Sequence, residues 1–412
     1  MKAIILRILN KIISEAYKVE YTLQSRLGYC IHWLSGGRPQ TRIIKRHYIK
    51  PTGRSAREST KNKACIFAAY HNSEKAPASN INYISSLHAC GFKVFYVHNG
   101  QLTHQAIDSL TPFCEQIISR SNIGQDFGAW KDGYIYCMKN QLLTNTEWLL
   151  LCNDSNFFLG GGHATTFITT FNRELRSTKS DLIALNKNYE CWQHYQSYFL
   201  CFHSRIFTKK AFNKFWEQYL PLNNRFHAIK KGEIALTRNI IGSASASILF
   251  DSPKLHQAIT ECDSPAEDIL QYLPKDSLSN LQIAREQLSQ PINKVYLHQI
   301  LAYLDYHNPG HAYALLWVKF LKSPFLKKDL YRQGVFSLPQ IISMLNNEDI
   351  DDESKILEEI LHGYTSEGSS SSYIYYPREA CRKGIPLPPT QIFHGYGYKL
   401  VNDTTIKPNG NA

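Results

Sequence analysis

The chain has 412 residues, 43% of them hydrophobic, and a formal net charge of +12. This is enough for one large α/β domain with a smaller helical part. The charge predicts an anionic partner, and because no zinc-finger spacing, basic zipper or RNP-like aromatic pair is present, we expect a membrane surface or a phosphorylated substrate and no nucleic acid. The ten cysteines are scattered without a C-x-x-C pair, which argues against structural zinc and favours a reducing, cytoplasmic setting.

The first segment has the pattern of an amphipathic helix. Apolar residues recur at helical spacing (Ile4, Ile5, Ile8, Leu9, Ile12 and Ile13), and Lys2, Arg7, Lys11 and Lys18 lie off that stripe. Such a helix suits a membrane interface, and docking on its own domain is an equally good interpretation. A basic stretch over residues 36–60 follows and is expected to be a linker. No apolar run is long enough to span a bilayer.

A βαβ unit begins the main domain. Residues 65–69 and 93–97 are expected strands, and residues 80–90 are an expected helix that Gly91 ends. This order predicts a parallel sheet whose ligands bind at the carboxyl ends of the strands. Tyr70 and Asn99 follow the two strands and are therefore candidates for binding a phosphorylated donor substrate.

The most informative stretch covers residues 121–133, with Asn122, Gly124, Asp126 and Gly128 in an expected loop before a helix from 129 towards 143. Glycines let backbone approach a ligand closely, and a helix start favours phosphate. A buried strand over residues 148–151 then stops at Asn153-Asp154-Ser155. The Asp154 carboxylate is a hard oxygen ligand suited to Mg²⁺ or Mn²⁺ beside a diphosphate. We therefore expect a divalent metal on Asp154, with these residues holding the donor.

These motifs resemble the rhamnan synthesis protein F family, in which Asn-x-Gly-x-Asp-Phe-Gly-(Ala/Ser)-Trp-Lys precedes an Asn-Asp-Ser at a strand end. Further stretches resemble the same family over roughly residues 65–331, namely 194–200, 212–216, 232–237, 308–311 and 323–328. The layout is also similar to the wider GT-A group of glycosyltransferases. Ser155 stands where that group has a second metal-binding Asp, which weakens the metal inference.

The resemblance implies a transfer reaction at the cytoplasmic membrane. The donor would be a nucleotide sugar carrying rhamnose or a related deoxyhexose, with dTDP-rhamnose as one candidate, and the acceptor a lipid-linked glycan of a surface polysaccharide. The resemblance thus implies an inverting hexosyltransferase that is cytoplasmic and peripheral at the inner face of the membrane, where an anionic membrane surface would be a partner.

Glu233 is our candidate general base, with Asp126 and Asp181 as rivals, because attack by an acceptor hydroxyl needs a carboxylate to take its proton. A glutamate at a helix start is the alternative interpretation of Glu233. His194, Gln196 and Tyr198 are candidate sugar-binding residues, since strand alternation would expose Gln196 and Tyr198 on one face. A satisfied buried pair is the alternative.

The expected fold is α/β, with a GT-A-like (Rossmann-like), mostly parallel sheet flanked by helices and a helical C-terminal region. We divide the chain into residues 1–60 (amphipathic helix and basic linker), 61–250 (GT-A-like domain), 251–365 (helical region) and 366–412 (Ser-, Pro- and Gly-rich tail). Two other functions remain open: a non-catalytic nucleotide-sugar-binding partner in a glycan-assembly complex, and a peripheral membrane adaptor.

Overall fold

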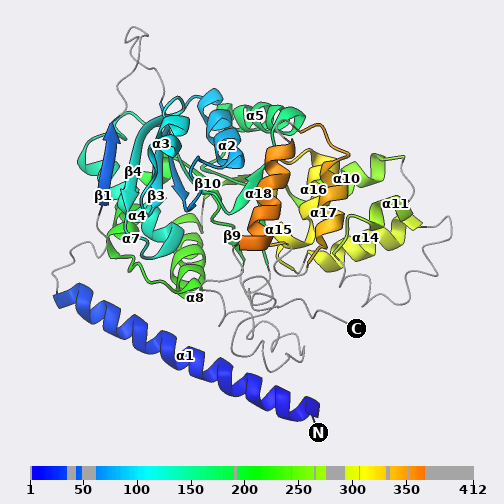
Figure 1. Ribbon diagram of the computed structural model, residues 1–412, viewed down its shortest axis with the longest axis horizontal. Helices are drawn as coiled ribbons and strands as arrows, with labels where there is room; N and C mark the ends of the chain where they lie inside the picture. The colour runs from blue at the N-terminus through cyan, green and yellow to red at the C-terminus, as the bar shows by residue number, and fades with distance from the viewer. Residues whose placement is uncertain are drawn as a thin grey trace, which may run out of the picture.

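The computed structural model describes residues 2–34, 43–48, 62–274 except 178, 190–192, 243 and 264–265, and 293–366 except 306, 331–334 and 351–352. A sheet of eight strands in the order β1-β4-β3-β2-β5-β10-β7-β11 forms its centre (Figure 1). The strands are β1 (Ile43–Tyr48), β2 (Lys63–Ala69), β3 (Phe92–Asn99), β4 (Cys114–Arg120), β5 (Trp148–Asn153), β7 (Leu182–Ala184), β10 (Phe199–His203) and β11 (Ala246–Ile248).

The sheet is mostly parallel, as the βαβ pattern predicted. Strand β2 runs parallel to β3 and β5, and β3 runs parallel to β4, whereas β10 is antiparallel to β5 and β7. From β2 the chain moves outward to β3 and β4 and then returns to place β5 on the other side of β2. The strand order therefore reverses between β2 and β5, and this is the position where open α/β sheets bind ligands.

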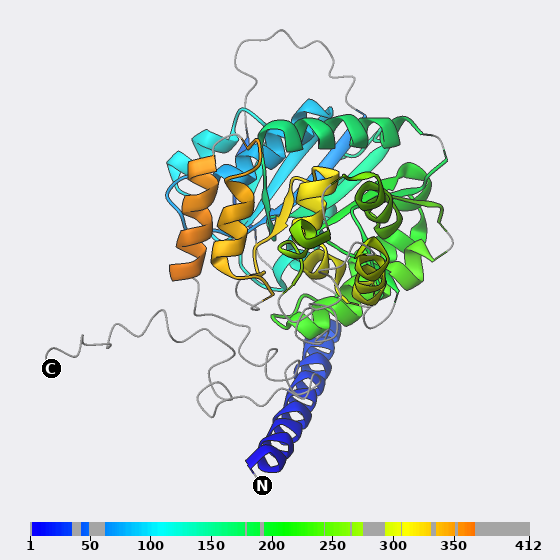
Figure 2. The same cartoon turned by 90° about the vertical axis from the view of Figure 1, so that its right-hand side faces the viewer.

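Helices cover both faces of the sheet (Figures 1 and 2). Alternate β2 residues enter different cores, with Cys65 and Phe67 in one and Ile66 in the other, because successive strand side chains point to opposite faces. The first core contains α2 (Ala78–Ala89) and α5 (Gly161–Arg176), and the second contains α4 (Gln125–Lys139) and α7 (Lys210–Gln218).

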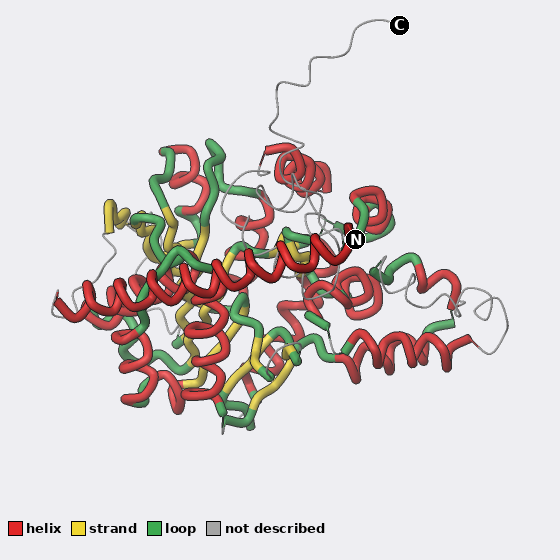
Figure 3. The backbone as a smooth tube through the Cα atoms, turned by 90° about the horizontal axis from the view of Figure 1, so that it is seen from below, coloured by secondary structure: helices red, strands yellow, loops and turns green. Residues whose placement is uncertain are grey.

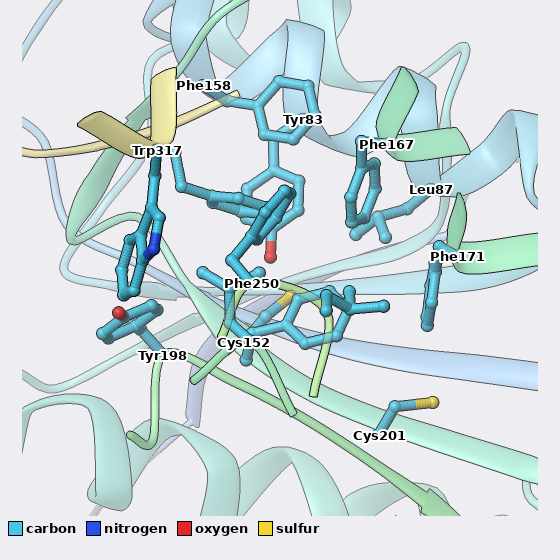
Figure 4. Close-up of a cluster of buried hydrophobic side chains, with 14 of the residues drawn as sticks. Tyr83, Leu87, Cys152, Phe158, Phe167, Phe171, Tyr198, Cys201, Phe250 and Trp317 are labelled. Carbon is cyan, nitrogen blue, oxygen red and sulfur yellow. The ribbon is translucent and has the colours of Figure 1, made fainter. Parts of the chain in front are cut away.

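Aromatic rings fill the first core, as Figure 4 shows for Tyr83, Phe158, Phe167 and Phe171. Tyr83 stacks on Phe158 with ring centroids 4.7 Å apart, and Phe158 meets Phe167 edge to face at 5.6 Å. Much of the aromatic content therefore stabilises the core by burial and ring packing rather than facing a sugar.

The remaining elements are short or lie in the C-terminal region. Before residue 250 they are α3 (His104–Leu110), β6 (Asn156–Phe158), β8 (Lys187–Asn188), β9 (His194–Tyr195), α6 (Ser204–Phe207), α8 (Arg225–His227), η1 (Ala228–Glu233), α9 (Ile234–Leu236) and η2 (Thr237–Ile241). After it they are α10 (Ser252–Glu261), α11 (Ala266–Leu270), α14 (Asn293–Leu304), α15 (Pro309–Ala312), α16 (Ala314–Leu321), β12 (Phe325–Lys327), α17 (Leu338–Leu345) and α18 (Glu353–Ser366).

The C-terminal region is largely helical but contributes a strand that the sequence analysis missed. Strand β12 pairs antiparallel with β6, with Lys327 opposite Asn156. This pairing brings residues 325–327 next to the segment that follows β5. Residues 275–292 of the expected helical region and the tail after residue 366 lie outside the described residues.

The N-terminal helix α1 (Lys2–Leu34) lies beneath the body, as Figures 1 and 3 show. Within the predicted linker, residues 43–48 form β1, which pairs antiparallel with β4. Its isoleucines and tyrosine favour a strand despite the neighbouring cations. None of the helices in the described part of the chain has the length and apolar character needed to cross a bilayer.

Candidate active site at the ends of the central strands

Asp154 lies at the point where the strand order reverses. Its backbone amide donates to the Ala68 carbonyl at 3.1 Å, and its Oδ2 accepts a hydrogen bond from the Tyr70 amide at 3.0 Å. The Asp154 carboxylate is therefore fixed between the carboxyl ends of β2 and β5. Tyr70 itself is half-exposed beside it.

Asp126 provides a second carboxylate at this position. It lies in the first turn of α4, and its Oδ2 accepts a hydrogen bond of 2.6 Å from Asn153 Nδ2. Burial and then the charge of Asp154 raise the pKa of Asp126 to about 7, although the Asn153 hydrogen bond and Lys327 lower it. The sequence analysis named Asp154 alone as a metal ligand, because Ser155 replaces the second Asp, and gave Asp126 a donor-binding or base role. The fold brings Asp126, from a different element, to the same position.

Lys327 of β12 and the next residue, Lys328, lie on the segment beside the carboxylates, and the charge of Lys327 acts on Asp126. Lys327 Nζ lies 4.6 Å from the centre of the Tyr198 ring, and the Lys328 amide donates to the Ser155 carbonyl at 3.0 Å. Next to them, Asp329 Oδ1 lies 2.9 Å from His311 Nε2 and its Oδ2 lies 3.5 Å from Arg225. Burial opposes ionisation of Asp329, but His311, Lys327 and Arg225 outweigh it and hold its pKa well below the usual range.

The sequence analysis did not assign these lysines a role. The stretch 323–328 carried part of the family resemblance, but its cations precede no recognisable phosphate motif. The pairing of β12 with β6, which the sequence pattern does not reveal, places them here.

Glu233 is held near the same site by residues of β9 and of the turn that follows it. Its Oε1 accepts hydrogen bonds from the Ser197 amide at 3.0 Å and from Ser197 Oγ at 2.5 Å, and its Oε2 lies 3.8 Å from His194 Nε2. Its charge also contributes to the raised pKa of Asp126. Because Glu233 lies inside a continuous helical stretch from Arg225 to Ile241, the helix-start interpretation is wrong.

Gly232 allows η1 to approach α4 closely. A Cβ there would lie 2.7 Å from the Phe127 ring of α4, a distance that any larger residue would have to relieve by moving one of the two helices. The glycine thus brings η1, with Glu233 at its end, against the helix that carries Asp126.

Gln196 and Tyr198 do not lie on one strand face as expected. Both are buried in the turn between β9 and β10, where the strand alternation does not apply. Tyr198 Oη accepts a hydrogen bond of 2.5 Å from Asn186 Nδ2, and burial raises the Tyr198 pKa. His194 is also buried, in β9.

The loop before α4 is held by hydrogen bonds from Arg120 and Asn223. Asn99 Oδ1 and the Ile123 carbonyl both accept from the Arg120 guanidinium, which also binds Asp132 at 2.7 Å. Asn223 contacts the Gly124 amide at 2.7 Å and the Asn122 carbonyl at 3.4 Å. Asn99, Asn122 and Gly124 thus build the frame of the site.

Helix α4 begins at Gln125, four residues earlier than expected. Gly124 has a φ of 79°, which turns the chain directly into the helix. A Cβ on Gly128 would lie 2.2 Å from the Ile123 carbonyl oxygen. Asp126 and Gly128 therefore belong to the first turn of α4 and not to a loop.

Asp181, one of the rival bases, is far from this site. It precedes β7 at the amino end of that strand, and its Oδ1 lies 2.5 Å from Arg205 Nε. The site residues gather at the carboxyl ends of the strands, so Asp181 is excluded as a base. An open cavity of about 440 Å³ beside Tyr29, Lys214 and Lys231 includes none of the predicted site residues.

The carboxylates of the site suit a divalent metal whose coordination is completed by substrate phosphates. Within the described ranges, no three His, Cys, Asp or Glu side chains are grouped to hold a metal. Mg²⁺ is commonly held by one or two carboxylates together with substrate phosphates. Asp126 and Asp154 fit that arrangement, because the charge of Asp154 increases the cost of ionising Asp126 and a cation would relieve it.

Comparison with known proteins adds the family. The sequence model of the rhamnan synthesis protein F family matches residues 94–297. This match supports the resemblance to that family which the motifs of the sequence indicate. The family suggests a polysaccharide biosynthesis protein, and the matched range contains Asp126, Asp154 and Glu233.

A relative from Sinorhizobium fredii, the uncharacterized protein y4gN, is 28% identical over 153 residues. The alignment covers 36% of this chain and 38% of that protein, so the chain matches well under half of the relative's length. The comparison therefore rests mainly on the rhamnan synthesis protein F match. Tyr70, Lys327 and α1 lie outside the range that this match covers.

Proposed function

We propose that the protein is a glycosyltransferase of the GT-A type that moves rhamnose or a related deoxyhexose from a nucleoside-diphosphate sugar to a lipid-linked surface polysaccharide. The observation that carries this proposal is the meeting of Asp126, Asp154 and Lys327 where the strand order reverses. A family involved in rhamnan synthesis supports the sugar class, and dTDP-rhamnose is the first donor to test.

The charges suit a diphosphate. Lys327 and Lys328 offer cations, and the amide end of α4 adds partial positive charge. Asp126 and Asp154 would hold Mg²⁺ or Mn²⁺, which would offset the charge on the departing nucleoside diphosphate. A metal between the carboxylates and the phosphates would allow groups of both signs to share one site.

In this proposal Glu233 acts as the general base. The acceptor hydroxyl oxygen forms a bond to the anomeric carbon, while the bond from that carbon to the diphosphate oxygen breaks and its electron pair leaves with the nucleoside diphosphate. The hydroxyl proton passes to Glu233, which Ser197 holds in position. Direct displacement of this kind inverts the anomeric carbon.

The test compares Glu233→Gln with Glu261→Gln, a change of an exposed glutamate on α10. We expect Glu233→Gln to lower the rate of sugar transfer, measured as acceptor-dependent release of nucleoside diphosphate, by about 10²–10⁴-fold, because a positioned base contributes that much. Donor binding should persist in both variants. Full turnover in Glu233→Gln would remove this base, and donor binding without turnover in the wild type would support the non-catalytic partner instead.

A further inference from the structure

Helix α1 presents two opposite faces. Tyr21 Oη lies 3.3 Å from His227 Nδ1, and a Cβ on Gly28 would lie 2.8 Å from a Leu220 methyl carbon. Tyr21 and Gly28 are seven residues apart, so they lie on one side of the helix, against the body. This is the docked face of α1.

The opposite face is apolar and exposed. Val19, Leu23, Leu27 and Leu34 are 59%, 63%, 63% and 75% exposed, and spacings of four, four and seven residues align them in one stripe. Trp33, at 79% exposure, lies near it at the end of the helix. Soluble surfaces rarely show so many large apolar side chains together, and such patches mark interaction sites.

Charge identifies the partner of this stripe. Residues 1–60 contain twelve Lys and Arg against three Glu, whereas the remaining 352 residues contain 34 against 31. Lys214 and Lys231 also line the hollow beside Tyr29. A second copy of this chain would bring two strongly cationic segments together, but an anionic bilayer attracts both the cations and the apolar stripe.

We infer that the stripe Val19, Leu23, Leu27 and Leu34 docks α1 in the plane of an anionic lipid bilayer, with Trp33 at the headgroup level. Exposed aromatic rings with a polar atom suit that level. The inference uses none of the residues assigned to sugar transfer, and so it goes beyond the proposed function.

The docked face explains what membrane binding would achieve. Segment 220–227 contacts α1 through Leu220 and His227, and its Pro221 and Asn223 pack against the loop that opens α4. Figure 3, seen from below, shows α1 crossing under the body. A bilayer on the far side of α1 would therefore lie one helix away from the candidate active site, where a lipid-linked substrate would arrive.

The test uses the full chain and two kinds of vesicle: phosphatidylcholine alone, and phosphatidylcholine with phosphatidylglycerol in equal parts. We expect sedimentation with the anionic vesicles only, weakened by salt. The double variant Leu23→Gln and Leu27→Gln should partition more weakly by a factor on the order of a hundred, because two buried leucines are lost. The control Leu23→Met and Leu27→Met, which stays apolar, should bind like the wild type.

Trp33 gives a direct signal, because the four other described tryptophans are buried. Anionic vesicles should shift its emission to the blue, and Trp33→Phe should remove the shift. The inference is overturned if the wild type stays in the supernatant, if the glutamine variant binds equally well, or if the stripe instead drives a dimer without vesicle binding. Nucleotide-sugar binding, measured on the same variants, should not change. If the wild type binds no nucleotide sugar, that result counts against the proposed function and not against membrane binding.

Discussion

At the scale of one residue, the buried charge of Asp126 lowers the stability of the fold, although the proposed metal site needs that charge. Burial and Asp154 raise its pKa to about 7, so near neutral pH the carboxyl is partly protonated in the absence of a cation. The unfolded carboxyl has its pKa near 4. Folding therefore favours the protonated form, and the stability that this group contributes falls as the pH rises through that window.

Replacing Asp126 by Asn should consequently stabilise the protein while weakening metal-dependent donor binding. We expect a gain of at least about 1 kcal/mol in unfolding free energy at about pH 8 and little change at about pH 4, where the unfolded carboxyl also begins to be protonated. Thermal melts at the two pH values check this. A variant less stable than the wild type at the higher pH would show that Asp126 is not the strained carboxylate described.

At the scale of elements, the start of α4 is set by close packing. Gly124 turns the chain in the left-handed region, and Gly128 lets the Ile123 carbonyl approach the helix. Arg120 and Asn223 hold the same loop by hydrogen bonds. The glycines that looked like ligand contacts in the sequence thus act first on the backbone of the site.

We therefore predict that Gly128→Ala lowers stability by about 2 kcal/mol or more, since the added methyl group meets a backbone oxygen. Gly162→Ala is the control, because its Cβ would lie 3.3 Å from the Asp349 carboxylate and would meet no backbone atom. Denaturant unfolding measures both. Unchanged stability in Gly128→Ala with lost donor binding would instead assign this glycine to the ligand.

Local pattern predicted the central elements well and the site only in part. The strands around β2, β3 and β5 and the helix ended by Gly91 follow from apolar runs and turn chemistry. The pairing of β12 with β6 depends on contacts between residues about 170 positions apart in the chain, which no local period encodes. For that reason the sequence analysis gave Lys327 no role. It named Asp154 and Asp126 as separate candidates, and the hydrogen bond that joins Asp126 to Asn153 at the end of β5 appears only in the fold.

At the scale of the whole molecule, Glu348 joins the C-terminal helices to α5. Lys319 of α16 and Lys322, which follows that helix, donate to it at 3.0 and 2.6 Å, and His163 Nε2 of α5 lies 3.2 Å away. Burial opposes its charge, but these three partners prevail and lower the pKa of Glu348 to about 2. The carboxylate thus stabilises the fold above its unfolded pKa near 4.3, and this stabilisation is lost as the pH falls towards 2.

Glu348→Gln should destabilise the protein by about 2–3 kcal/mol near neutral pH, because three partners lose a buried charge. The difference from the wild type should shrink once the pH falls below about 4, where protonation begins to remove the stabilisation that the wild-type carboxylate provides. Melting curves over this range decide the matter. A difference that stays constant with pH would show that charge is not what Glu348 contributes.

The central claim is that a nucleotide sugar binds with a divalent metal at Asp154 and Asp126. The most direct measurement is a thermal-shift panel of nucleotide sugars, with and without Mn²⁺, on the wild type, Asp154→Asn and Asp181→Asn, since a ligand that binds only the folded state must raise its melting temperature. We predict a shift with one donor that needs Mn²⁺, disappears in Asp154→Asn and persists in Asp181→Asn, whose carboxylate lies at the opposite end of the strands. No shift with any donor in the folded wild type, or an equal shift in Asp154→Asn, would contradict the claim.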